Sequence, residues 1–357
     1  MPISAVDAID PAFQHAKKQL FQPFRFGQWA RLALVGLLAG ELGSGGGCNG
    51  NFNIPSSTHR QGGTEQFLSQ DWPKLLGDHP VMSASLIAIL VLVGLGLVVL
   101  FTYIGSVMRF ILFDSIVARE CHIREGWARR EREGHRLFVW QMILMLLSLL
   151  LFVILIGIPA AFAWGLGWFR HPSEHVPGLI VGGILLFLVF LAAILAFAVA
   201  HVMTKDFVVP QMALENITAL EGWRRLWLWL QAEKGSYAGY IGMKVVLAIG
   251  IGIAITIISF IVILVIMLPT GFLGAMIFIG AKSAGATWSP YNISLAVSAG
   301  LIVLAILVFA LSMISVPATV FFPAYSIYFL AARYPALADV VWPRQPGPVA
   351  PGEVGLT

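Results

Sequence analysis

The sequence predicts an all-α integral membrane protein: a six-span helical bundle with amphipathic interfacial helices and an internal parallel repeat. Hydrophobic residues make up 58% of the 357 residues and charged residues 11%, whereas soluble domains have about 45–50% and about 25%. Too little polar surface remains to cover such a chain in water. Long apolar runs and a one-sided distribution of basic residues are the second and third observations. Disorder, a disulfide scaffold and nucleic-acid binding are excluded as the main theme.

A transmembrane helix needs roughly 20 mostly apolar residues, and six runs are predicted to cross the membrane. These runs are 26–42, 81–114, 137–164, 179–203, 237–268 and 293–328. The first run is the shortest and carries Arg31 and Glu41 near its ends. The alternative is five spans, in which 26–42 is re-entrant or the N-terminal lysines lie outside.

Basic residues predict the orientation, because cytoplasmic loops carry an excess of Lys and Arg. With six spans, 18 of the 22 Lys and Arg residues fall on one side. The other side holds only Arg60, Lys74, Arg170 and Lys282. We therefore expect a multi-pass protein of a prokaryotic cytoplasmic membrane, with the N-terminus and the tail 333–357 in the cytoplasm.

The first predicted element is an amphipathic helix at 11–21. Its apolar residues recur at helical spacing, and they are Val6, Ile9, Phe13, Ala16 and Leu20. Such a helix lies in the membrane interface; packing on the cytoplasmic ends of the spans is an equal alternative. The first span leads into an outside loop, 43–80, in which many glycines indicate a flexible or tightly turned chain.

Two stretches of the chain resemble each other and predict the repeat. In each stretch an Asp ends an inward-running span, an EGW triplet opens a basic segment, and an outward-running span follows. The first copy has Asp114 and the triplet at 125–127, and the second has Asp206 and the triplet at 221–223. Both copies cross the membrane in the same direction, so the repeat is parallel.

The EGW segments carry the polar side chains with the clearest possible role. Arg binds phosphate with several donors, and Trp prefers the headgroup level of a bilayer. Predicted contacts with anionic lipid headgroups or a membrane protein partner are Arg124, Trp127, Arg129, Arg130, Trp223, Arg224 and Arg225. The alternative is that these arginines are the topology signal alone.

Asp114 and Asp206 are the predicted ion-pair partners of these arginines, because a carboxylate at the membrane boundary is costly unless it is paired. In the second copy we expect Asp206 to couple to Arg224. Thr218 and Glu221 form a capping-box pattern there. This pattern predicts a second interfacial helix at 219–232.

No set of residues predicts catalysis or a cofactor. The string 171–175 reads HPSEH, the pattern of one class of zinc peptidase, which makes His171, Glu174 and His175 weak candidates for a metal site. That chemistry needs both histidines on a helix and a third ligand, but the string lies in a short loop between two predicted spans. Ionisable side chains inside a membrane mark ion paths, and here they occur only at span ends. We therefore expect no metal, no cofactor and no enzymatic activity.

The chain resembles a family of uncharacterised prokaryotic membrane proteins related to the membrane domain attached to some glycerophosphoryl diester phosphodiesterases. The resemblance rests on PFRFGQWARLALVGLLAG at 23–40 and the glycines after it, DFVVPQMALENITALEGWRRL at 206–226, and FFPAYSIYFL at 321–330. It implies a membrane module. In that family the diesterase chemistry belongs to a separate soluble domain, for which this chain has no room, so the resemblance implies no catalytic residue.

These observations favour a non-catalytic membrane module that handles lipid or supports a membrane partner complex. A facilitator or transporter for a small uncharged or amphiphilic solute is the alternative from another class, and an outside-facing metallohydrolase is a remote third. A continuous polar cavity through the bundle would favour transport, whereas a solid, grooved or lipid-filled bundle would favour the module.

Overall fold

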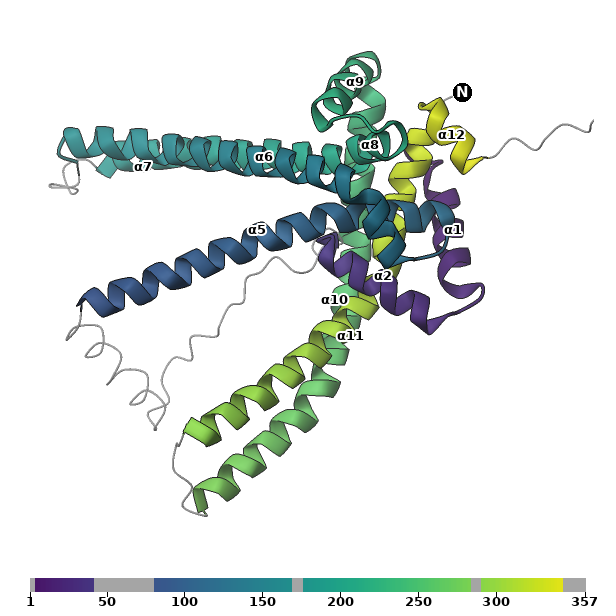
Figure 1. Ribbon diagram of the computed structural model, residues 1–357. Coiled ribbons are helices and arrows are strands. Elements are labelled where there is room, and N and C mark those ends of the chain that lie inside the picture. The colour runs from purple at the N-terminus through teal and green to yellow at the C-terminus, as the bar shows by residue number, and fades with distance from the viewer. Residues whose placement is uncertain (1–3, 42–79, 169–175, 284–289, 343–357) are drawn as a thin grey trace, which may run out of the picture.

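The computed structural model describes residues 4–41, 80–168, 176–283 and 290–342 (Figure 1). Within these residues all regular elements are helices, so the all-α prediction is confirmed. The elements are α1 (Ile9–Phe21), α2 (Phe26–Leu38), α5 (Pro80–Ala118), α6 (Ile123–Gly165), α7 (Val176–Met203), the π-helix η3 (Thr204–Val208), α8 (Val209–Glu215), α9 (Ala219–Ala232), α10 (Lys234–Ser283), α11 (Pro290–Ala331) and α12 (Pro335–Val341).

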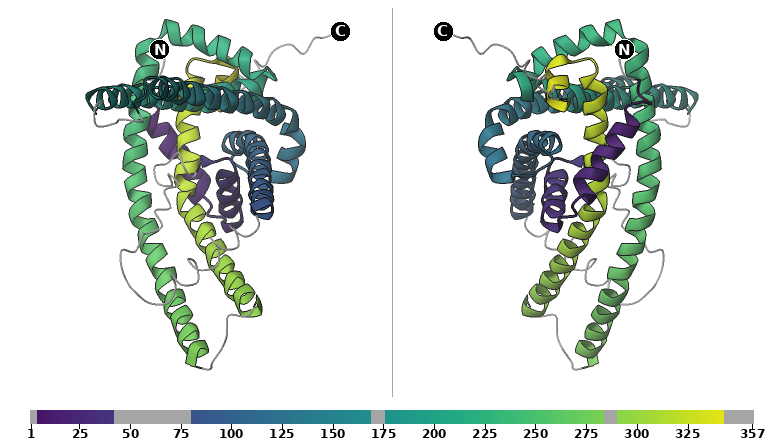
Figure 2. Two further views of the ribbon diagram at one scale, coloured as in Figure 1. Left: turned by 90° about the vertical axis from the view of Figure 1, so that its left-hand side faces the viewer. Right: turned by 90° about the vertical axis from the view of Figure 1, so that its right-hand side faces the viewer.

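Five helices are long and apolar enough to cross a membrane: Ile87–Ala118, Ile123–Gly165, Val176–Glu215, Lys234–Ser283 and Tyr291–Ala331. They leave one common region in three directions (Figures 1 and 2). We call their outward parts the arms: α5 alone, α6 with α7, and α10 with α11. We call the common region the hub, where the inner ends of the arms meet α1, α2, α8, α9 and α12.

The hub and the arms differ in burial. In the hub, Tyr240 stacks on Tyr325 with 5.1 Å between ring centroids, and Phe329 and Phe207 pack against the same Tyr240 ring. These contacts join η3, α10 and α11 in one aromatic core. In the most apolar 18-residue stretch of each arm helix, at most 6% of the residues are buried. The hub therefore packs like a protein interior, whereas the arms leave their apolar side chains uncovered, as helices that cross a membrane do.

Helix α2 belongs to the hub. Its 13 residues are about 20 Å long, whereas the hydrocarbon core is about 30 Å thick. A Cβ at Gly36 would lie 2.5 Å from Thr319 of α11, and a Cβ at Gly105 of α5 would lie 2.9 Å from the Leu38 carbonyl oxygen. Both glycines thus permit close helix contacts. The predicted span 26–42 is a short hub helix, and the count of six spans is not confirmed.

Helix α1 is also part of the hub, where it packs along α11. Its buried face consists of Ala12, His15, Ala16, Gln19 and Leu20. Of the predicted apolar stripe, Ala16 and Leu20 are buried, whereas Val6 and Phe13 are exposed. Polar side chains take part in the buried face of α1. His15 and Gln19 donate hydrogen bonds to the Ile116 and Ser115 carbonyl oxygens, which have no partner within α5 because they lie in its last turn.

The remaining predicted elements agree with the structure more closely. Helix α9 covers 219–232 as predicted, and Thr218 accepts a hydrogen bond from the Glu221 N–H, so the predicted cap is confirmed. Helix α6 begins at Ile123, so the first basic segment and the predicted span 137–164 form one continuous helix. The predicted outside loop lies, up to residue 79, beyond the described residues.

Candidate functional site

In the first copy, Asp114 at the inner end of α5 is paired with Arg130 of α6. Arg130 donates from Nε to one carboxylate oxygen at 2.8 Å and from Nη2 to the other at 2.7 Å. Its third donor, Nη1, reaches the Ala213 carbonyl oxygen of α8 at 2.7 Å. One guanidinium therefore joins α5, α6 and α8, and this bidentate geometry is the strongest that an Arg and a carboxylate can form.

In the second copy, the predicted coupling of Asp206 to Arg224 is wrong. Asp206 of η3 accepts a hydrogen bond from the Tyr240 hydroxyl at 2.9 Å and forms an ion pair with Lys244, both on α10. The Arg224 side chain is 78% exposed and lies 3.8 Å from Glu221.

The reason is that the two arginines stand one residue closer to the triplet in the second copy than in the first. Three residues after Trp127 stands Arg130, and three residues after Trp223 stands Leu226, which is fully buried. On a helix that offset selects the face directed at the hub. The second copy presents a leucine there, and its aspartate takes a partner from α10.

Both triplets place their glycine inside and their tryptophan at half burial. A Cβ at Gly126 would lie 3.1 Å from Ile111, and a Cβ at Gly222 would lie 2.7 Å from Val208. Trp127 packs edge-on against Tyr103, with 6.2 Å between ring centroids. Trp223 instead donates from Nε1 to the Thr204 hydroxyl at 3.0 Å. The packing of the triplets is similar, although their polar partners differ.

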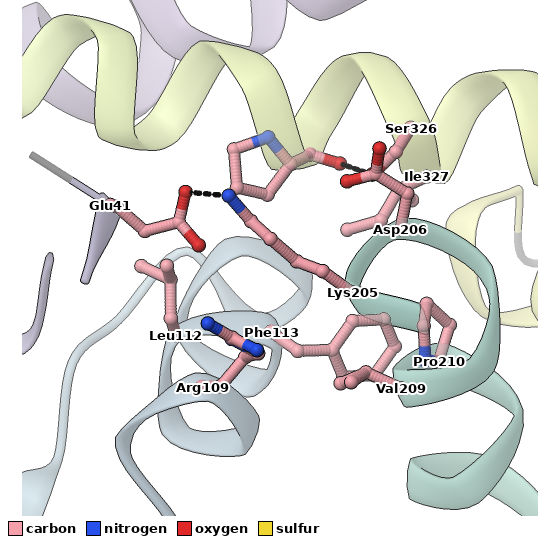
Figure 3. Close-up of a pocket in the computed structure, with 11 residues that line it drawn as sticks. Glu41, Arg109, Leu112, Phe113, Lys205, Asp206, Val209, Pro210, Ser326 and Ile327 are labelled. Carbon is pink, nitrogen blue, oxygen red and sulfur yellow. Dashed lines mark hydrogen bonds and ion pairs between the residues drawn. The ribbon is translucent and has the colours of Figure 1, made fainter. Parts of the chain in front are cut away.

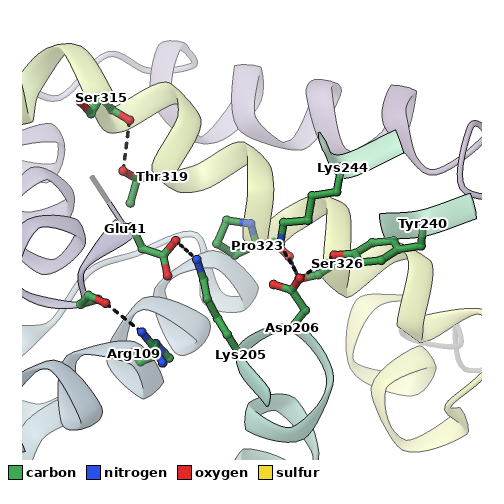
Figure 4. A network of polar contacts seen from close by, with 11 residues as sticks. Glu41, Arg109, Lys205, Asp206, Tyr240, Lys244, Ser315, Thr319, Pro323 and Ser326 are labelled. Carbon is green, nitrogen blue, oxygen red and sulfur yellow. Dashed lines mark hydrogen bonds and ion pairs between the residues drawn. The ribbon is translucent and has the colours of Figure 1, made fainter. Parts of the chain in front are cut away.

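A buried charge cluster lies where α2, α5, η3, α10 and α11 meet (Figure 4). Lys205 of η3 is paired with Glu41 just beyond α2, and both side chains are at most 8% exposed. The neighbouring Asp206 holds Lys244, as described above. Charges removed from water to this degree are costly unless they are paired and hydrogen-bonded.

Arg109 of α5 completes the buried charge cluster and is 9% exposed. Its Nη2 donates to the Ala39 carbonyl oxygen at the end of α2 at 3.1 Å, while Nε and Nη1 are buried and have no acceptor among the described residues. It lines a cavity of about 20 Å³ together with Glu41, Lys205 and Asp206 (Figure 3). The volume is sufficient for about one water-sized atom.

A second and larger hollow lies on the surface between α5 and α6. It has a volume of about 650 Å³ and is lined by Tyr103, Ala128, Arg129, Glu131, Arg132, His135 and Arg136. We call it the arginine hollow. Arg136 is held there by hydrogen bonds to the backbone and side-chain oxygens of Asn216. Its lining carries three guanidinium groups against one carboxylate, which is suited to an anion.

The predicted contact residues fall in different surroundings. Arg129 lines the arginine hollow, whereas Arg130 is inside the hub with Asp114. Arg225 is paired with Glu215 and Glu221 on the hub surface. Arg124 and Arg224 are exposed outside the hollow.

The metal candidates His171, Glu174 and His175 lie outside the described residues. Across the described ranges, no group of three or more His, Cys, Asp or Glu side chains is close enough to hold a metal ion.

Sequence reasoning missed Glu41, Arg109, Lys205 and Lys244 as one cluster. The available signal was their common place: each lies near the end of a different apolar run. Charges at span ends are ordinarily solvated, so their convergence follows only from the way the inner ends of the helices meet.

A family model described as a family of unknown function (DUF7544) matches residues 3–340. No curated protein matches the chain, and no solved structure matches it.

Proposed function

The chain belongs to DUF7544, a family of unknown function, and we propose that it is a non-catalytic membrane module that holds anionic phospholipid. The phosphate group of the lipid binds in the arginine hollow, and the acyl chains lie along the arms. The hub lies at the cytoplasmic face of a prokaryotic membrane, with both termini on that side. The earlier resemblance to a phosphodiesterase-linked membrane domain is compatible with a lipid role.

The place of the arginine hollow along α6 carries the proposal. Its lining ends at Arg136, and the exposed side chains of α6 become apolar from Val139 and stay so to Phe162. On α5, Tyr103 lines the hollow, and most side chains from Ile87 to Phe101 are exposed and apolar. The basic side chains therefore lie at the boundary where an apolar band begins, which is the headgroup level of a bilayer.

The divergence of the arms supports lipid rather than protein between them. Leu146 of α6, Leu195 of α7 and Phe260 of α10 are each at least 60% exposed. An uncovered apolar surface of this extent is compatible only with a membrane or a partner. The two cavities described above lie at the hub and beside the start of α6, and neither runs along the arms, so they give the facilitator alternative no support.

The location of α1 and α12 supports the proposal that the termini share one side, since both helices lie at the hub (Figure 1). Helix α2 ends at the hub, whereas α5 begins at the outer end of its arm. With both termini on the hub side, the proposed topology therefore has an even number of crossings: the five long spans and one further crossing in the stretch from α2 to the start of α5, as in the six-span prediction. The parallel repeat relates the α5–α6 connection to the α7–α10 connection.

The test is lipid retention after purification in mild detergent, measured by native mass spectrometry. In the double variant Arg129→Gln/Arg132→Gln, two charges near the membrane surface are lost, each worth about 1 kcal/mol. We expect retention of phosphatidylglycerol to weaken by about thirtyfold and the salt dependence of binding to decrease.

The matched control is Arg124→Gln/Arg224→Gln, which removes the same charge outside the hollow. Equal loss of lipid from both variants would show that the arginines act only through net charge. A photo-crosslinker at Leu146 or Leu195 should label lipid; crosslinks mainly to another protein would favour a partner complex instead.

A further inference from the structure

Arg109 has an unusual environment for a cation. It lies on α5 at the base of the arms and is nine-tenths buried, and within the described residues its only hydrogen bond goes to the Ala39 carbonyl oxygen. Two further donors, Nε and Nη1, have no acceptor in the part of the chain that the structure describes. A guanidinium cannot lose its proton in a protein, so a buried Arg with open donors requires a partner or remains strongly unfavourable.

The charges around Arg109 do not balance. Among the described residues, the buried charge cluster contains Arg109, Lys205 and Lys244 against the carboxylates Glu41 and Asp206. Lys205 and Lys244 each hold one of the two carboxylates, which leaves one positive charge over. An additional anion would complete both the charge count and the hydrogen bonds of the guanidinium.

The cavity beside Arg109 has the size for such an anion. Its volume of about 20 Å³ exceeds the roughly 10–15 Å³ that a cavity needs to hold one water-sized atom. Arg109 and Lys205 line it from α5 and η3 (Figure 3). The Lys205 ammonium has three N–H donors and directs one to Glu41, so donors remain for a ligand.

We propose that this cavity binds one small anion, held by Nε and Nη1 of Arg109 and by the Lys205 ammonium. The coordinating atom carries negative charge and is about as large as a water molecule. A halide ion and a single oxygen of a phosphate group share this chemistry. The site does not depend on the lipid-holding proposal, because it uses none of the residues of the arginine hollow.

The experiment uses the full-length, delipidated protein in a gluconate buffer of constant ionic strength. Chloride, inorganic phosphate and the short-chain lipid dihexanoyl-phosphatidylglycerol are titrated separately, and the thermal unfolding temperature is measured. We expect at least one of the three to raise that temperature saturably. The responding probe identifies the source as a halide, a free phosphate or a lipid phosphate.

The variant Arg109→Gln should abolish the response, whereas Arg124→Gln, an exposed control, should keep it. Should Arg109→Gln not fold, Arg109→Lys keeps the charge without the Nε donor and should bind at least tenfold more weakly. Equilibrium dialysis of the responding probe against wild-type protein should give one ion per chain that Arg109 variants lose. No response to any probe, or an equal response in the Arg109 variants, would overturn the site.

Discussion

Asp114 and Asp206 occupy corresponding places, at the points where α5 and α7 enter the hub, and their surroundings differ. The Asp114 side chain is 22% exposed and is held by Arg130 of the next helix. The Asp206 side chain is 1% exposed and is held by Lys244 and Tyr240 of α10. The aspartate of the first copy is paired within its own repeat, whereas the aspartate of the second copy is paired with a lysine 38 residues further along the chain.

This difference shows that a repeated pattern determines where a carboxylate lies and does not determine its partner. The arginine that faces Asp114 is replaced by Leu226 in the second copy. Burial then requires another cation, because an unpaired carboxylate is least tolerable where water is excluded. The deeper copy thereby becomes part of the buried charge cluster that also contains Arg109 and Lys205.

The largest expected effect belongs to the second copy. Asp206→Asn leaves Lys244 charged and buried without a counter-ion, and we expect a loss of about 3–5 kcal/mol in the free energy of unfolding. The double variant Asp206→Asn/Lys244→Met removes both charges and should be more stable than Asp206→Asn alone. The free energy of unfolding of each purified variant is measured in detergent. A double variant that is less stable than either single variant would contradict the pairing.

The first copy should respond less to the same change. Asp114→Asn removes charge-assisted hydrogen bonds to a partner that water can still reach, and we expect a loss of about 1.5–3 kcal/mol. A double-mutant cycle with Arg130→Gln should show coupling, whereas the cycle of Asp206→Asn with Arg224→Gln should be additive within about 0.5 kcal/mol. Coupling in the second cycle would restore the equivalence of the two copies.

The glycines of the two triplets give a comparison that does not involve charge. Gly222→Ala would bring a Cβ to 2.7 Å from Val208, and Gly126→Ala would bring one to 3.1 Å from Ile111. Overpacking of this kind costs about 1–3 kcal/mol, with the larger loss expected at Gly222. The unfolding temperatures of the two variants test this order. A greater loss of stability in Gly126→Ala would contradict it.

Stability should depend on pH at the hub end of α5, next to the Asp114 of the first copy. His15 of α1 donates from Nε2 to the Ile116 carbonyl oxygen at 3.0 Å and accepts from the Tyr328 hydroxyl at 3.1 Å, so the neutral ring fits the site. Burial, and next the charge of Arg119, lower the pKa of His15 below its usual 6.5. Below pH 6.5 the unfolded chain therefore binds more protons than the folded one.

Stability from this residue is fully present well above pH 6.5 and should decrease as the pH falls through 6.5 towards the lowered pKa of the folded state. His15→Gln removes the titrating group, and its unfolding temperature should depend less on pH over that range. An unchanged pH slope in the variant would exclude His15 as the cause.

The smallest effect is expected at Arg224. Its side chain is 78% exposed and its Glu221 contact is 3.8 Å long, so Arg224→Gln should change the free energy of unfolding by less than about 0.5 kcal/mol. The thermal unfolding temperature should be unaltered. A loss comparable to that of Asp114→Asn would mean that α9 contacts a partner through this arginine.

The sequence alone determined the features that depend on composition and short-range spacing. Apolar runs long enough for a bilayer predicted the five arm helices, because helix length and hydrocarbon thickness are both set by local geometry. Thr218 predicted the start of α9 because a cap acts within one turn. The basic character of the start of α6, which lines the arginine hollow, was also evident from the residue types.

The tertiary structure alone decided which elements meet. The packing of α2 in the hub depends on Gly36 and Gly105, which allow close helix contacts that a hydropathy pattern does not predict. The ion pair of Lys205 with Glu41 joins residues 164 positions apart. The buried position of Arg109 results from the same convergence. Partner choice among buried charges is a property of three-dimensional distance and water exclusion, and a linear sequence specifies these only through the whole fold.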